Sequence, residues 1–309
     1  MTALDDTPAV QAQTRRDRWG RYLVVPPKGG TPVGYTRVTT VAKTLDDGSA
    51  LGPWKATATV VGAFRRPGIM ASWRALVAEH PDPWYGGDAA KAECKRLVEE
   101  SMQAGGSTDR ASIGTALHKL CEMHDRGCPP EGLDETTAAD LAAYAAAINA
   151  AGITFDPVGI ERTVVLDDHR VAGTADRFAA IVPGRRLPVV ADLKTGGSLD
   201  FSGGSIAVQL AAYAHATAGY AQGARANGKD DERLALPAVD LDVALVIHLP
   251  AGEARCVLQW IDIAAGWQAF EQSMAVREWR KTSRRLFSPF VPTTATNQVD
   301  EATAHPSPS

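Results

Sequence analysis

The feature that most constrains the fold of this chain is a pair of β-rich runs separated by a turn. The runs are Arg170–Val182 and Leu187–Lys194, and Pro183-Gly184-Arg185-Arg186 interrupts the pattern between them. Because proline and glycine mark turns between strands, this segment predicts a hairpin. The second run contains the apolar triplet Val189-Val190-Ala191, which is typical of a strand buried at the centre of a sheet. We therefore expect a central sheet built around this hairpin.

The second run ends in charged residues, Asp192-Leu193-Lys194-Thr195-Gly196. Side chains two residues apart on a strand lie on the same face, so Asp192 and Lys194 project together. If the two runs pair antiparallel, Asp176 in the first run can approach them. Two close carboxylates repel each other unless a cation lies between them, and Mg²⁺ prefers oxygen ligands. A lysine beside them can stabilise an anionic transition state, so the segment predicts metal-dependent hydrolysis of phosphodiesters.

Two helices are expected to accompany the hairpin. Downstream, Ser205–Tyr220 is compatible with a helix, and its Gln209 and Tyr213 are four residues apart, on one helix face. Upstream, a helix is expected to start near residues 107–109 and to end near Arg126, before a glycine. It carries His118 and also Gly114, whose missing side chain would let a backbone or a phosphate approach closely.

These segments together resemble a known family. Gly173-Thr174-Ala175-Asp176, the Asp192–Gly196 segment and Gln209–Tyr213 follow one another as in the PD-(D/E)XK nuclease superfamily. The most similar branch is the RecB-type nuclease domain, shared with CRISPR-adaptation nucleases and phage exonucleases. It also places a histidine on an upstream helix, in a setting that Gly114-Thr115-Ala116-Leu117-His118 matches. The resemblance implies an α/β, restriction-endonuclease-like fold, with a mixed central sheet flanked by helices and an N-terminal helical part.

The resemblance also implies roles for individual residues. His118, Asp176, Asp192 and the backbone carbonyl of Leu193 would bind Mg²⁺ or Mn²⁺. Asp176, Asp192 and Lys194 would be catalytic, and Lys194 would position the attacking water or steady the charge on the phosphorane.

Further residues are expected to support this site. By the same resemblance, Gln209 and Tyr213 would line the DNA path and brace the site, and Thr195 belongs to the same motif as Lys194. Glu161 starts a strand expected over Ile160–Leu166. It either supports the metal site or a lysine, or it pairs with a surface arginine.

A basic stripe is expected on the last helix, Ala264–Arg285. Its cations follow at helical spacing and lie on one face. They are Arg277, Arg280, Lys281, Arg284 and Arg285. The stripe is either a surface that follows DNA phosphates or a solvated helix end, where cations also suit the helix dipole.

Composition limits the other functions. The net charge of −4 argues against a wholly basic nucleic-acid binder, but it allows a local basic groove. Some relatives hold an iron–sulfur cluster with several late cysteines. Here only Cys256 follows Tyr213, so we expect no such cluster. The chain has no GxxxxGK[ST] motif, so no nucleotide cofactor is expected. It also shows no secretory signal and no apolar run long enough for a membrane helix, which favours a cytoplasmic protein without a membrane partner.

The expected domain plan has four parts. Residues 1–19 form a disordered tail, 20–106 an N-terminal helical part, 107–287 the nuclease core and 288–309 a second disordered tail. In the helical part, Lys55–Arg66, Ile69–His80 and Asp88–Gln103 read as helices.

The sequence thus favours a divalent-metal-dependent DNA nuclease that recognises its substrate through the phosphate backbone. By family analogy an exonuclease is favoured, acting in DNA recombination, repair or phage DNA metabolism, with a possible protein partner in recombination. One alternative is a non-cleaving protein that binds DNA or a partner on a nuclease scaffold. Another is an endonuclease, whose recognition region would have to come from the N-terminal helices.

Overall fold

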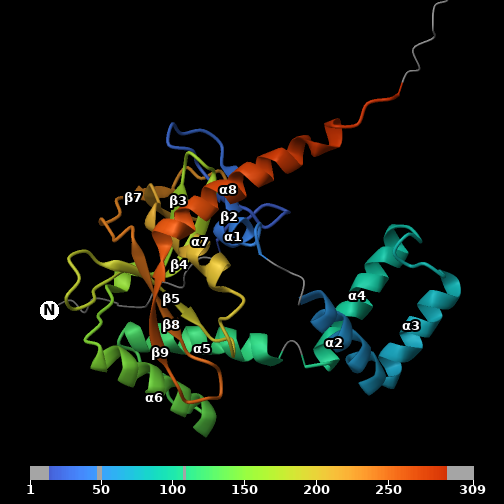
Figure 1. Ribbon diagram of the computed structural model, residues 1–309, viewed down its shortest axis with the longest axis horizontal. Coiled ribbons are helices and arrows are strands. Elements are labelled where there is room, and N and C mark those ends of the chain that lie inside the picture. Colours follow the sequence, from blue (N-terminus) through green and yellow to red (C-terminus); the bar gives the residue numbers. More distant parts are fainter. Residues whose placement is uncertain (1–13, 47–50, 107–108, 291–309) are drawn as a thin grey trace, which may run out of the picture.

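The structure is a computed structural model that describes residues 14–46, 51–106 and 109–290. Within these ranges the chain is α/β, with a mixed nine-stranded sheet and helices on both of its faces (Figure 1). The α/β class and the mixed sheet are therefore as expected from the sequence. The expected tails, 1–19 and 288–309, lie largely outside the described residues. No helix in the described part of the chain is long and apolar enough to cross a membrane.

The expected hairpin lies at the centre of the sheet. Its strands pair antiparallel, with Arg177 opposite Ala191 and Ala180 opposite Val189, and the register shifts between these two pairs. The strands follow one another across the sheet as β7 (Glu232–Leu234), β6 (Ala218–Ala221), β3 (Ile160–Leu166), β4 (Val171–Ala180), β5 (Val189–Lys194), β8 (Val243–His248) and β9 (Val257–Asp262). β5 pairs in parallel with β8, and β2 (Val33–Arg37) pairs in parallel with β4, while β1 (Tyr22–Val24) pairs antiparallel with β2.

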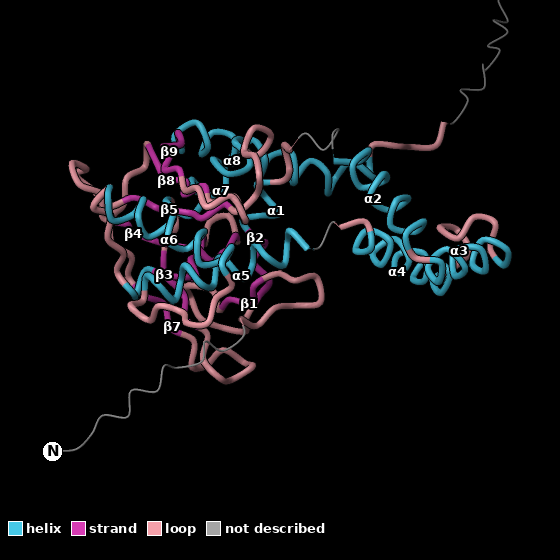
Figure 2. The backbone as a smooth tube through the Cα atoms, turned by 90° about the horizontal axis from the view of Figure 1, so that it is seen from below, coloured by secondary structure: helices cyan, strands magenta, loops and turns pink. Residues whose placement is uncertain are grey.

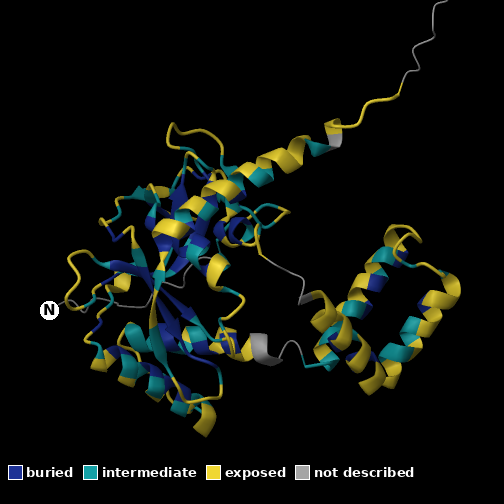
Figure 3. Cartoon of the chain, in the orientation of Figure 1, coloured by how far each residue is buried: buried dark blue, intermediate teal, exposed yellow. Residues whose placement is uncertain are grey.

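Helices bury both faces of the central strands. The helices α1 (Val38–Ala42), α7 (Gly203–Ala214) and α8 (Ile263–Thr282) cover one face, and α5 (Asp109–Asp125) and α6 (Glu135–Ala150) cover the other. On β5, Val190 packs into the first core, whereas Val189, Ala191 and Leu193 pack into the second. A strand covered on both sides has no solvent face, which explains its continuous apolar run. Figure 3 shows this band of buried strands.

Three helices stand beside the sheet as a separate helical part (Figures 1 and 2). They are α2 (Leu51–Arg65), α3 (Pro67–Glu79) and α4 (Asp88–Ala104). A small core of Leu76, Ala90, Cys94 and Leu97 joins α3 to α4, and α2 packs closely on α4. The three expected helices are thus present. The helical part begins at Leu51 rather than at residue 20, because β1, β2 and α1 pack on the central sheet.

The helix expected over residues 205–220 is wrong at its C-terminal end. α7 ends at Ala214, and residues 218–221 form β6 at the side of β3, with Val164 opposite Gly219. The run Ala214–Ala221 is short and rich in alanine, so its local pattern does not separate helix from strand. Pairing with β3 decides its conformation.

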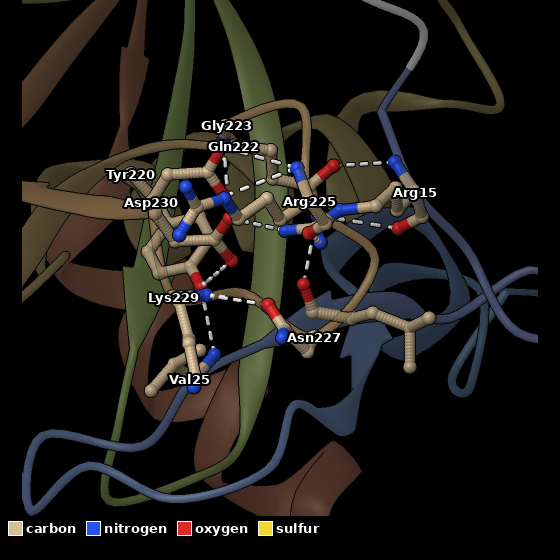
Figure 4. A network of polar contacts seen from close by, with 11 residues as sticks. Arg15, Val25, Tyr220, Gln222, Gly223, Arg225, Asn227, Lys229 and Asp230 are labelled. Carbon is tan, nitrogen blue, oxygen red and sulfur yellow. Dashed lines mark hydrogen bonds and ion pairs between the residues drawn. The ribbon is translucent and has the colours of Figure 1, made fainter.

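Residues 14–19 belong to the folded body, although the sequence suggested a tail. The Arg15 guanidinium donates to the carboxylate of Asp231 and to the backbone carbonyl of Arg225, and its backbone N–H donates to Gln222. Tyr220 joins this network, because its hydroxyl donates to Asp231 at 2.5 Å (Figure 4). The loop between β6 and β7 therefore holds the start of the described chain in place. The remaining short elements are the 3₁₀ turns η1 (Pro157–Gly159) and η2 (Ser283–Arg285).

Candidate active site

The hairpin and α5 bring a histidine and an aspartate together at one end of the sheet. His118 Nδ1 lies 3.5 Å from Asp176 Oδ2. The same carboxylate oxygen accepts a hydrogen bond of 2.9 Å from the backbone N–H of Leu193 on the neighbouring strand. This contact ties Asp176 directly to the segment that carries Asp192 and Lys194.

A second group of contacts joins β5 to α7. Lys194 Nζ lies 2.5 Å from Asp192 Oδ2, as their spacing on one strand face predicts. Gln209 Nε2 donates to Asp192 Oδ1 at 3.0 Å and is 3.3 Å from the hydroxyl of Tyr213. The amide oxygen of Gln209 accepts from Lys194 at 3.4 Å. Gln209 therefore binds both the Asp192 carboxylate and the Lys194 ammonium, and the hydroxyl of Tyr213 holds Gln209 in place.

Two glycines make this convergence possible. A Cβ on Gly114 would lie 2.6 Å from Thr195 Oγ1, so α5 can approach the end of β5 only without a side chain there. A Cβ on Gly173 would lie 2.6 Å from the ring of Tyr213. The sequence suggested that a backbone or a phosphate approaches Gly114, whereas the neighbour is the side chain of Thr195. Thr195 thus supports the site by packing.

Burial shifts the charge balance of the site. It raises the pKa of Asp176, and together with the charge of Asp176 it raises the pKa of Asp192 to about 6, although Lys194 opposes this. Burial alone would lower the pKa of Lys194, but Asp192 outweighs it, and the net shift is upward. Burial lowers the pKa of His118. The imidazole is thus neutral at pH 7, with a lone pair free for a ligand, and its contact with Asp176 is not an ion pair there.

Glu161 is the third carboxylate on this side of the sheet. Ile160 lies opposite Arg177 and Arg162 opposite Ala175, which places Glu161 opposite Asp176. Its backbone is in the left-handed region, with φ of 53°, a conformation that costs a non-glycine residue energy. Burial and then Asp176 raise the pKa of Glu161 to about 7. Among the described residues no arginine forms an ion pair with it, which favours the site-facing interpretation over a surface pair.

A pocket of about 1320 Å³ opens over these residues. His118, Asp176, Glu161 and Thr195 line it, whereas Asp192 is only 1 % exposed and lies beneath it. The pocket also contains Glu122, which was not expected from the sequence. Glu122 follows His118 by one turn of α5 and accepts from Lys119 at 2.8 Å and from Arg126 at 3.1 Å. Its spacing of four from His118 was the available signal.

A buried polar cluster behind Asp176 was also missed. Arg177 donates to the carboxylate of Asp125 at 2.6 Å, and the hydroxyl of Tyr144 donates to the same carboxylate at 2.7 Å. Arg177 also donates to the backbone carbonyl of Asp176 at 2.9 Å. The cluster thus fixes the strand beside the catalytic candidate. Asp125 lies seven residues after His118 on the same helix, but nothing in the sequence indicates its partner.

The donor chemistry of the site fits a divalent cation, although the donors do not already enclose one. Within the described residues no group of three or more His, Cys, Asp or Glu side chains is arranged as a metal cage. However, His118 is a neutral imidazole, Asp176 and Asp192 are buried carboxylates, and the charge of Asp176 raises the pKa of Asp192. A divalent ion would relieve this repulsion. To bind it, Asp192 would have to share its carboxylate between the ion and Lys194.

The basic residues of α8 lie away from this pocket. Arg277 is half-buried, Arg280 is exposed, and Lys281 donates to Glu278 at 2.6 Å. None of these three lines the pocket, and the side chain of Arg284 lies outside the described residues. If they contact DNA, they do so at a distance from the carboxylates.

Comparison with known proteins assigns no family to this chain. No protein-family model matches the chain, and a search of curated proteins finds no significant match.

Proposed function

We propose that this protein is a divalent-metal-dependent deoxyribonuclease with a restriction-endonuclease-like core of the RecB-type PD-(D/E)XK kind. The observation that carries the proposal is the meeting of Asp176, Asp192 and Lys194 at one end of the central hairpin, with His118 beside Asp176. Three short motifs that are spread over about a quarter of the chain supply this group, and each contributes a residue type that phosphodiester hydrolysis needs.

The residues divide the chemistry among themselves. His118, Asp176, Asp192 and the carbonyl of Leu193 would hold Mg²⁺ or Mn²⁺. When bound, the ion would lower the pKa of a water molecule and polarise the scissile phosphate. Lys194 would orient the attacking water and offset the negative charge that develops on the phosphate. Gln209 would keep Lys194 and Asp192 in register, because it binds both.

Within this proposal an exonuclease is favoured over an endonuclease by the family resemblance alone. The setting would be cytoplasmic DNA recombination, repair or phage DNA metabolism, with a possible protein partner. DNA would be held mainly through its phosphates, partly by the basic stripe of α8.

One observation favours a second candidate, a DNA- or partner-binding protein on a nuclease scaffold. Asp192 is already engaged by Lys194 and Gln209. A protein that never binds a metal would keep this arrangement.

An assay on linear and on covalently closed circular DNA tests the proposal, with Mg²⁺ or Mn²⁺ and with EDTA. We expect the native protein to degrade linear DNA only when the metal is present. The cleavage rate of Asp192→Asn should be lower by about 100-fold or more. The variant should stay folded at neutral pH, because a neutral side chain suits this buried position. Glu253→Gln, which removes an exposed pocket carboxylate, is the matched control and should retain activity.

Each result of the assay has a definite meaning. Cutting of closed circles would make the enzyme an endonuclease. A folded and fully active Asp192→Asn would contradict the metal assignment. Binding of DNA without cleavage in any metal would favour the scaffold candidate.

A further inference from the structure

The pocket over the candidate active site has two chemically different walls. One wall carries the ionisable side chains His118, Asp176 and Glu161. The other wall is formed by α2 of the helical part, which contributes Trp54, Thr57, Ala58 and Val61. Trp54 is 51 % exposed and Val61 is 37 % exposed. They are seven residues apart, two helical turns, and therefore lie on one face of α2.

Contact with α4 sets which face of α2 is turned to the pocket. A Cβ on Gly62 would lie 1.7 Å from the backbone oxygen of Ser101, and a Cβ on Gly105 would lie 2.3 Å from that of Ala58. The two helix backbones thus touch, and α2 cannot rotate without losing this contact. The indole of Trp54 is held at the pocket by the contact that the neighbouring positions Ala58 and Gly62 of its helix make with α4.

The charges of the pocket do not suit a duplex. Lys119 is the only basic residue among the described residues that line it, and Lys119 already donates to Glu122 at 2.8 Å. A duplex needs Lys and Arg for the phosphates of both strands. An uncharged aromatic wall suits instead the face of an unpaired base, because every base has a π-face that stacks on an aromatic ring.

We propose that Trp54 stacks an unpaired base of the DNA strand whose phosphate lies against Asp176, with Val61 flanking that base. The substrate at this site is then single-stranded DNA or an unpaired end. This inference rests on the proposed function, and it assigns the helical part a role in substrate recognition.

Binding of labelled oligothymidine, about 12 nucleotides long, tests the stacking site in EDTA, where no cleavage occurs. The full-length protein is compared with Trp54→Ala by fluorescence anisotropy. We expect about 10- to 100-fold weaker binding of the single strand by Trp54→Ala, and near-native binding by Trp54→Phe, which keeps an aromatic face. Affinity for a blunt duplex of the same length should be unaffected by either change.

Trp84→Ala is the matched control. Trp84 is 46 % exposed in the loop before α4, lies 4.7 Å from Lys91 Nζ and does not line the pocket. Its removal should leave binding of the single strand unchanged. Because both tryptophans are half exposed, thermal melting should confirm that all three variants are folded.

The outcomes separate this inference from the proposed function. Unchanged single-strand affinity in Trp54→Ala would overturn the stacking site, even if the protein cleaves DNA. Equal losses for single strand and duplex would also overturn it, because α2 would then contact a duplex. Calorimetric titration with Mn²⁺ should give the same affinity in Trp54→Ala as in the native protein. If the native protein itself does not bind Mn²⁺, the proposed function is contradicted instead.

Discussion

At the scale of single residues, the site is a balance of buried charges. Burial raises the pKa of both Asp176 and Asp192, the charge of Asp176 raises that of Asp192 further, and Lys194 offsets only part of these shifts. Gln209 binds both Asp192 and Lys194 without adding charge of its own. Glu161 adds a further carboxylate opposite Asp176, with a strained backbone and a raised pKa. Such concentrations of unfavourable features are typical of sites that bind a cation or a substrate.

Glu161 gives a prediction on pH dependence. Its pKa rises from about 4.5 in the unfolded chain to about 7 in the folded protein. The folded state therefore prefers the protonated form, and its stability falls as pH rises from about 4.5 through about 7. Glu161→Gln lacks this loss. In EDTA, its free energy of unfolding should exceed the native value at about pH 8, and the difference should shrink towards about pH 5.

Urea unfolding at the two pH values measures this difference. Glu131→Gln, on an exposed loop, is the control and should follow the native protein at both. A Glu161→Gln difference that does not change with pH would show that the carboxyl is not destabilised by burial.

At the scale of elements, one close contact limits how α5 docks on β5. Gly114 faces Thr195, and His118 lies one turn further along the same helix. A shift of α5 at Gly114 would therefore move His118 away from Asp176. The same logic holds at Gly173, where the ring of Tyr213 occupies the space of a side chain.

The Gly114 contact gives a prediction for a pair of substitutions. Gly114→Ala places a methyl group 2.6 Å from Thr195 Oγ1, and overpacking of this kind costs about 1–3 kcal/mol of stability. Alanine also favours the helix over glycine by about 1 kcal/mol. We therefore expect Gly114→Ala to destabilise the native protein or leave it unchanged, and to weaken Mn²⁺ binding.

In the background of Thr195→Ala the same substitution should become stabilising, because Thr195 Oγ1 is gone and the next atom, Cβ, is at 3.6 Å. Urea unfolding of the four proteins measures the coupling. Strictly additive effects would show that Gly114 and Thr195 do not limit each other.

At the scale of the whole molecule, the net charge is negative, but the C-terminal part of α8 carries several cations. The C-terminal part of α8 extends beyond the sheet, towards the side on which the helical part lies (Figures 1 and 2). Arg280 and Lys281 are exposed there. Cations on a projecting helix can meet the phosphates of DNA outside the pocket, whose own wall is acidic.

The prediction at this scale concerns salt. Arg280→Glu together with Lys281→Glu should weaken DNA binding and lower the slope of log affinity against log salt by about one for each lost phosphate contact. Lys229→Glu is the control, because it changes an exposed cation on the loop between β6 and β7. A titration of DNA affinity at several salt concentrations measures the slope. If the double variant keeps the native slope, the stripe is a solvated helix end.

The sequence by itself determined what depends on residues close together in the chain. The period of a strand places Asp192 and Lys194 on one face of β5. The period of a helix places Gln209 and Tyr213, which are four residues apart, on one face of α7. The turn at Pro183-Gly184 specifies the hairpin that brings Asp176 to Leu193. These relations follow from local geometry, so a single sequence was enough to predict them.

Only the tertiary structure decided what depends on contacts between distant segments. Residues 218–221 form a strand because they pair with β3, although their local sequence would also suit the last turn of a helix. Glu161 faces Asp176 through the register of β3 on β4, and Trp54 reaches the pocket because α4 holds α2 in one orientation. Long-range pairing and close packing select among local alternatives of similar energy, and no short stretch of sequence contains that choice.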